Sequence, residues 1–183
     1  MILAVPHLGN WDVGAPRLSQ EVVSVMAVAE ALSPVWLRNW FVGFRRMLGM
    51  EIVLTDEGSR LVFTLTKKLK EGGLVALVSD RDIQGGGIEV DFFGERTTLP
   101  AGPAVLAERT GAPILPAAVY FRRDRGHRAV IKPPLPPSTE RDRKSRLKAM
   151  TQSLAHALEE LVREAPTQWH LLQPNWPSDR ELL

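Results

Sequence analysis

Short apolar runs alternate with stripes of apolar residues at helical spacing along the chain. Five runs are bounded by Gly, Pro or polar residues and predict buried strands, at 2–5, 22–29, 51–55, 74–80 and 114–121. Apolar positions three and four apart predict helices at 34–49, 61–69 and 101–113, and along a stripe from Leu147 to Leu161. Strands that alternate with helices indicate an α/β fold, with a mostly parallel central sheet flanked by helices.

The remaining pattern adds detail to this fold. Residues 88–94, IEVDFFG, are expected to continue the alternation, and Thr139 with Asp142 suggests a capping-box-like start for the last helix. The run Gly85 to Gly87 lacks the Lys and the spacing of a phosphate-binding loop, so we interpret it as a flexible turn. Without repeats or linkers, residues 1–183 are predicted to form one domain.

Composition narrows the chemistry. The 183 residues are 44% hydrophobic and 24% charged, which is typical of a globular chain. The chain has no Cys, which excludes a disulfide framework, a thiolate metal site and a Cys nucleophile. No apolar run approaches the roughly 20 residues of a membrane-spanning helix. The His residues lack the spacing of metal ligands, so no metal is expected.

Charge is unevenly distributed. The chain carries a net charge of +2, but residues 122–148 hold ten basic and three acidic residues. A charged run is often only a solvated face, but it can also attract an anionic membrane, nucleic acid or an acyl carrier. Nucleic acid is not expected, because the run has aromatic residues only at its edge and no recognised reading motif.

The stretch HLGNWD places a His at the end of the first predicted strand and an Asp at the start of the next helix. A hydroxyl is a poor nucleophile at neutral pH, so acyl transfer to it needs a base, and a carboxylate that orients an imidazole makes that base more effective. His7 and Asp12 would form such a pair, at the strand ends where open α/β sheets place their sites. The spacing alone also fits a purely structural pair.

Four segments together resemble the bacterial lysophospholipid acyltransferase superfamily. They are HLGNWD, FVGFRRMLGMEIV, TQWHLLQPNW and the long stretch that begins SDRDIQGGGIEVDFFGE and ends TGAPILP. Within it they look most like the branch that contains the lipid A acyltransferases and the actinobacterial phosphatidylinositol mannoside acyltransferase. Members of this family carry roughly a hundred residues or more before the His motif, so we expect an N-terminal part to be missing here.

The resemblance implies an O-acyltransferase that works without a cofactor. Its co-substrate would be a coenzyme A thioester, or an acyl carrier protein, and its acceptor a hydroxyl of a membrane glycolipid such as phosphatidylinositol mannoside. His7 would act as the base and Asp12 as its orienting partner, with no acyl-enzyme intermediate. Backbone amides in the loop 8–11 are candidate donors to the developing oxyanion.

The resemblance also suggests substrate-binding residues. Arg45 would contact donor or acceptor phosphates, although a solvated helix end is an equal alternative. Glu30 would face the head-group pocket, although a Glu at a strand end often caps a helix. Asp80 and Arg81 would flank the same cleft, and the pair of phenylalanines after Asp91 is expected to pack.

Trp36, Trp40 and Phe44 recur every four residues beside a polar side that carries arginines. Such a stripe fits either a core-facing helix or an interfacial helix at a membrane or acyl groove. The resemblance favours a peripheral position on the cytoplasmic face of the cell membrane. A lipid A type acyltransferase and a non-catalytic lipid-binding homologue stay open as alternatives; Asp12 argues mildly against the first, where Glu is usual.

Overall fold

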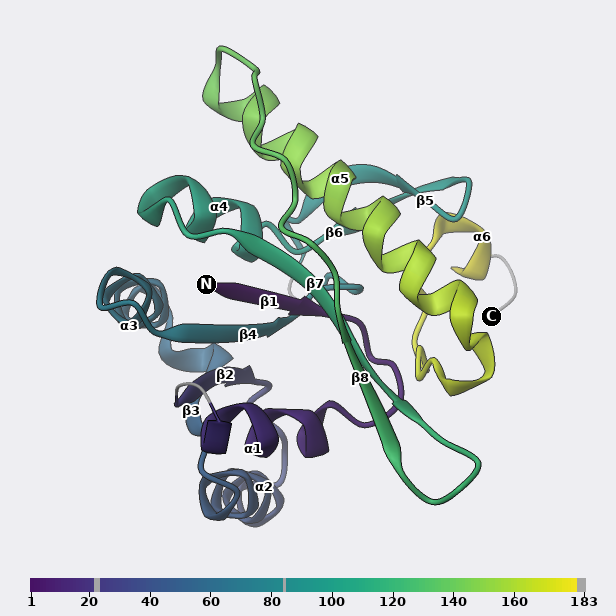
Figure 1. Ribbon diagram of the computed structural model, residues 1–183. Coiled ribbons are helices and arrows are strands. Elements are labelled where there is room, and N and C mark those ends of the chain that lie inside the picture. Colours follow the sequence, from purple (N-terminus) through teal and green to yellow (C-terminus); the bar gives the residue numbers. More distant parts are fainter. Residues whose placement is uncertain (22–23, 84, 181–183) are drawn as a thin grey trace.

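The computed structural model describes residues 1–21, 24–83 and 85–180. Its centre is a six-stranded sheet in the order β3-β2-β4-β1-β7-β8 (Figure 1). Its strands are β1 (Ile2–Val5), β2 (Val25–Ala29), β3 (Glu51–Leu54), β4 (Leu74–Val78), β7 (Ile114–Phe121) and β8 (His127–Ile131). All neighbours are parallel except β7 and β8. The predicted α/β fold is therefore confirmed; residues 22–23 of the predicted second strand lie outside the described residues.

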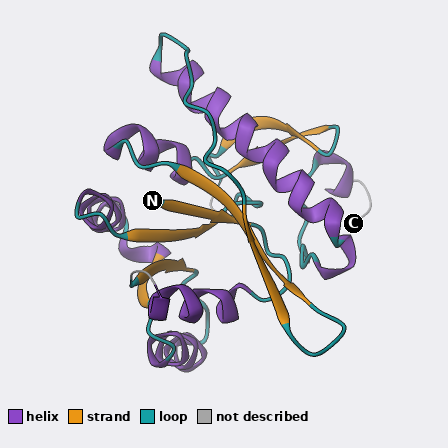
Figure 2. Cartoon of the chain, in the orientation of Figure 1, coloured by secondary structure: helices purple, strands orange, loops and turns teal. Residues whose placement is uncertain are grey.

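Helices cover both faces of this sheet (Figure 2). They are α1 (Trp11–Glu21), α2 (Val35–Met47), α3 (Ser59–Lys70), α4 (Gly102–Thr110), α5 (Arg143–Glu164) and the short α6 (Pro177–Arg180). The chain also has two 3₁₀ turns: η1 (Thr55–Glu57) lies between β3 and α3, and η2 (Pro166–Gln168) follows α5. Among the described residues, no helix combines the length and apolar character that crossing a bilayer requires.

The central strand β1 is buried on both faces, which is why its sequence is continuously apolar. Successive side chains of a strand point to opposite faces. Ile2 and Ala4 join the core under α3, α4 and α5, whereas Leu3 and Val5 join the core beside α1. The two hydrophobic cores, one on each face of the sheet, are thus formed by alternate residues of the same short strands.

Residues 88–99 depart from the predicted alternation. They form a separate antiparallel hairpin of β5 (Ile88–Phe92) and β6 (Glu95–Leu99), rather than a further strand of the sheet. The two turn residues, Phe93 and Gly94, both have positive φ, as a tight hairpin turn requires. The hairpin packs along α5, and the buried Glu159 accepts a hydrogen bond from the Phe93 amide at 2.7 Å.

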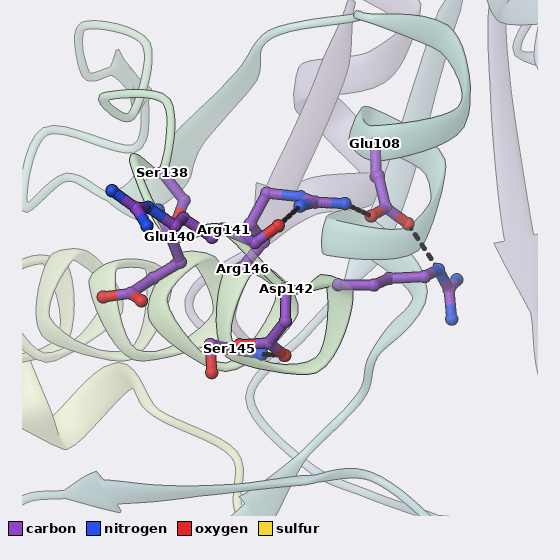
Figure 3. Close-up of polar contacts among 8 residues, drawn as sticks. Glu108, Ser138, Glu140, Arg141, Asp142, Ser145 and Arg146 are labelled. Atoms are coloured by element: carbon purple, nitrogen blue, oxygen red, sulfur yellow. Dashed lines mark hydrogen bonds and ion pairs between the residues drawn. The ribbon is translucent and has the colours of Figure 1, made fainter.

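The start of α5 also differs from the expected capping pair. Asp142 is itself the N-cap, because its carboxylate accepts from the Ser145 amide at 2.9 Å (Figure 3). Thr139 lies before the helix, which begins at Arg143. Hydrogen bonding to Ser145, through its side chain and then its amide, lowers the pKa of Asp142. Glu108 of α4 binds two arginines of this first turn, Arg143 at 2.8 Å and Arg146 at 3.0 Å. These ion pairs tie α5 to α4.

Candidate active site

The register of two parallel strands brings His7 and Asp80 together. Val5 of β1 lies opposite Val78 of β4, and the ladder continues as the Ser79 amide donates to the Val5 carbonyl at 2.9 Å. His7 and Asp80 each lie two residues beyond this last pair, so they leave the sheet at the same edge. This edge is the carboxyl end of the parallel strands, where open α/β sheets place their sites.

Asp80 holds His7 by two hydrogen bonds. Its carboxylate is fully buried and accepts from the His7 amide at 2.9 Å and from the ring Nδ1 at 2.7 Å. The Trp169 indole donates to the same carboxylate at 2.8 Å. A proton on Nδ1 satisfies the carboxylate and leaves the lone pair on Nε2 of a neutral ring. The partly exposed imidazole is therefore held in one orientation, with Nε2 left free to accept a hydrogen bond or a proton.

The pairing predicted between His7 and Asp12 is wrong in this structure, because Asp12 binds Arg45 instead. Arg45 donates to both carboxylate oxygens of Asp12, from Nε at 2.7 Å and from Nη2 at 3.2 Å. A guanidinium fits a carboxylate with two parallel hydrogen bonds, which accounts for both oxygens. The Arg45 guanidinium also lies over the Trp11 ring, 4.6 Å from its centroid. Asp12 thus positions Arg45, and Asp80 positions the imidazole.

A cavity of about 680 Å³ opens beside His7. Four of the six predicted site residues line it: His7, Glu30, Arg45 and Arg81. The other two, Asp12 and Asp80, each hold one of those four from behind. Much of the remaining wall is aliphatic, with Leu61, Leu65, Leu77, Val78 and Leu106 among its members. A polar end next to an apolar wall suits a ligand with a polar group and a hydrocarbon chain.

Arg81 differs from Arg45 in its charge balance. Its Nε is buried without a hydrogen-bond partner, and no described residue forms an ion pair with its guanidinium. The charge of Arg45, in contrast, is balanced by Asp12. Arg81 is therefore the better placed of the two to bind an anionic group in the cavity.

The loop 8–11 supplies fewer free amides than predicted. The amides of Leu8, Gly9 and Asn10 donate to the carbonyls of Pro6, Gln168 and Val119 at 2.7, 2.9 and 2.9 Å. They are therefore not available to an oxyanion. The amide of Trp11 is the first of α1, where helical amides lack intrahelical partners, and remains the candidate of the predicted set.

Gly9 is required by the close approach of this loop to β7. Its φ is +61°, and a Cβ atom at this position would lie 1.9 Å from the Val119 carbonyl oxygen. No other residue fits without moving the backbone. The loop that carries His7 is thus fixed to the neighbouring strand.

The C-terminal strap, residues 168–176, was missed by sequence reasoning as a part of the site. Its backbone flanks the His7 loop: the His170 amide donates to the His7 carbonyl at 2.8 Å, and the Asn175 side chain donates to the Asp80 carbonyl at 3.2 Å. Asp179 closes the strap by accepting from the Asn175 and Trp176 amides, which lowers the pKa of Asp179. The concentration of Trp, Asn and Gln in this segment was the available signal.

Four aromatic rings anchor the strap to the β5–β6 hairpin. Phe92, Phe93, Trp169 and Trp176 lie with ring centroids 4.8 to 6.3 Å apart. Phe92 is fully buried, which confirms the expected packing of the two phenylalanines. The strap and hairpin therefore form one aromatic unit behind Asp80.

The structure also places the aromatic stripe on α2 and the glycine turn at 85–87. Trp36 and Trp40 are 69% and 59% exposed, so the stripe on α2 is a surface feature and not a core face. The described residues hold no group of three or more His, Asp or Glu side chains arranged to bind a metal ion. Gly87 donates to Asp82 at 2.8 Å, which closes the glycine turn against the cavity wall.

Comparison with known proteins identifies the family. The profile of the family described as bacterial lipid A biosynthesis acyltransferase matches residues 1–178. The chain is 39% identical to the phosphatidylinositol mannoside acyltransferase of Mycobacterium tuberculosis (strain ATCC 25618 / H37Rv) and 38% identical to that of Mycolicibacterium smegmatis. Each alignment covers 97% of this chain, which spans 55% and 57% of the respective relative. The chain belongs to the bacterial lipid A biosynthesis acyltransferase family.

Proposed function

We propose that the protein transfers a fatty acyl chain from an acyl thioester to a hydroxyl of a membrane glycolipid, with His7 as the general base. The observation that carries this proposal is the imidazole held by buried Asp80 at the polar end of a largely aliphatic cavity. Such a cavity accommodates an acyl chain and presents its reactive end to the base. Phosphatidylinositol mannoside is the proposed acceptor, because the relatives are named for acyl transfer to that lipid.

The reaction needs one proton carrier. Nε2 of His7 takes the proton of the acceptor hydroxyl as its oxygen attacks the thioester carbonyl. The carbon–sulfur bond then breaks, and the imidazolium returns the proton to the leaving thiolate. Asp80 stabilises the imidazolium between these steps without itself being protonated, by analogy with the carboxylate of serine hydrolases. Acyl-coenzyme A is the proposed donor, with an acyl carrier protein as the alternative.

Other residues of the cavity bind the substrates in this proposal. Arg81, which lacks a carboxylate partner, binds a phosphate of the donor or acceptor, and Glu30 accepts hydrogen bonds from sugar hydroxyls at the cavity mouth. Arg45, whose charge Asp12 balances, shapes the polar end. The protein would work at the cytoplasmic face of the membrane as a peripheral protein, in keeping with the exposed tryptophans on α2.

The test is acyl transfer from palmitoyl-coenzyme A to phosphatidylinositol mannoside, read by mass spectrometry. We expect product from the purified chain and its loss, by at least about a thousandfold, in His7→Ala. His156→Ala is the matched control, because His156 is exposed on α5 and outside the cavity. Product from His7→Ala at the unaltered rate, or none from the unaltered chain with this acceptor or with a lipid A precursor, would overturn the proposal.

A further inference from the structure

The basic segment 122–148 is not one surface. Arg128 of β8 pairs with Glu164, the last residue of α5, at 2.6 Å, whereas Arg143 is the first residue of that helix. A helix of 22 residues spans about 33 Å at 1.5 Å per residue. The segment thus forms two clusters at opposite ends of α5 (Figure 1): the hairpin tip, residues 121–127, and the α5-start cluster, residues 141–148.

The hairpin tip lies at the end of the sheet that carries His7. β7 runs parallel to β1, and their paired residues end at Ala4 and Pro116. β7 continues to Phe121, so it projects past the end of β1 by about 13 Å, at roughly 3.3 Å per residue. The Asn10 amide donates to the Val119 carbonyl at 2.9 Å, which ties the His7 loop to this projecting part.

The tip combines unpaired positive charge with an exposed aromatic ring. Arg122 pairs with Asp124 at 2.6 Å, but Arg123 and Arg125 are exposed and form no ion pair within the described part of the chain. Phe121 is 45% exposed. Its ring lies 5.4 Å from that of His127.

We propose that the hairpin tip docks on an anionic lipid bilayer and so holds the end of the sheet that carries the cavity against the membrane. Exposed arginines are attracted to anionic head groups, and an aromatic ring beside them is suited to the interface. The α5-start cluster holds more charge, with five basic residues and one acidic residue against three and one at the tip, but it lies at the opposite end of α5 from the tip. The purpose of the docking rests on the proposed function, whereas the binding itself does not.

The experiment compares two double variants of the full chain by sedimentation with vesicles of phosphatidylcholine containing 30% phosphatidylglycerol. Arg123→Glu with Arg125→Glu reverses two charges at the tip. Lys144→Glu with Lys148→Glu reverses two exposed charges in the α5-start cluster and changes the net charge equally. At 0.15 M salt the Debye length is about 8 Å, so charges at the far end of α5 contribute little at the tip.

Each arginine near an anionic surface contributes about fivefold to partitioning. We therefore expect the tip variant to bind these vesicles at least about 25-fold more weakly, and the control variant to change by less than about twofold. Circular dichroism and thermal unfolding show whether both variants fold. Binding should be weak on pure phosphatidylcholine and should fall with added salt.

Three results would overturn the inference. They are an equal loss in both variants, an unchanged affinity of the tip variant, and equal binding to neutral vesicles. If the tip variant instead fails only with an acyl carrier protein as donor, the tip docks a protein. His7→Ala separates this inference from the proposed function, because it should abolish transfer and leave vesicle binding unaltered. In detergent, where no membrane is needed, the tip variant should keep the transfer rate of the unaltered chain.

Discussion

Replacement of Asp80 by Asn tests which carboxylate orients the imidazole. The oxygen atom Oδ2 of Asp80 accepts from the His7 amide and from the Trp169 indole, while Oδ1 accepts from Nδ1 of His7. Asn has the same shape but only one acceptor oxygen. That oxygen will occupy the position of Oδ2, because two fixed N–H groups point there. The amide NH₂ group then faces Nδ1 of His7.

The size of the effect follows from this geometry. An NH₂ group donates to Nδ1, so the neutral ring must carry its proton on Nε2 instead. The variant keeps its hydrogen bonds and its fold, but the nitrogen that faces the acceptor hydroxyl no longer has a lone pair. The same exchange behind the His of a serine protease lowers kcat by roughly 10⁴, and we expect a fall of about 10³ to 10⁴ in Asp80→Asn.

The assay measures kcat for palmitoyl transfer in Asp80→Asn and Asp12→Asn, with thermal unfolding as the check on the fold. Asp12→Asn weakens the interaction with the Arg45 guanidinium but leaves the hydrogen bond between His7 and Asp80 in place. We expect it to lower kcat by less than about tenfold and to act mainly on KM. If Asp12→Asn lowers kcat by 10³ or more while Asp80→Asn keeps a tenth of the activity, the assignment of Asp80 is refuted.

Three further predictions concern the cavity and the strap. Arg81→Ala should raise KM for the phosphate-bearing substrate about tenfold, with partial recovery in Arg81→Lys; a change under twofold in KM would contradict it. Trp169→Phe keeps an aromatic ring but loses the hydrogen bond to the Asp80 carboxylate, so kcat should fall about tenfold, and an unchanged kcat would contradict the role of the indole. Asp179→Ala should speed hydrogen exchange at the Asn175 and Trp176 amides about fivefold at pH 7, as followed by NMR. The folded-state pKa of Asp179 is lowered, so the carboxylate protects these two amides fully above its ordinary pKa of 3.8. This protection is lost as the pH falls through the lowered pKa, and there the variant and the unaltered chain should exchange at the same rate.

Much of the sheet was predictable because its strands are short, buried and separated by helices. Glu30, Arg45 and Arg81, which line the cavity with His7, were suggested by the resemblance to the acyltransferase superfamily and not by the strand pattern. The β5–β6 hairpin and β8 were not predictable, because their exposed positions make them only half apolar. Nothing in their sequence pattern shows that these strands pair antiparallel, or that β5 and β6 form a separate sheet.

The partner of His7 was hidden for a different reason. A parallel sheet joins residues by register, and the hydrogen bond from His7 spans 73 positions in sequence. The continuously apolar runs of β1 and β4 do not encode that these two strands are neighbours, so the nearby Asp12 was the more visible candidate. The spacing in HLGNWD nevertheless has a consequence for the cavity. His7 lines the cavity itself, and Asp12, five residues later, binds Arg45, which lines the same cavity.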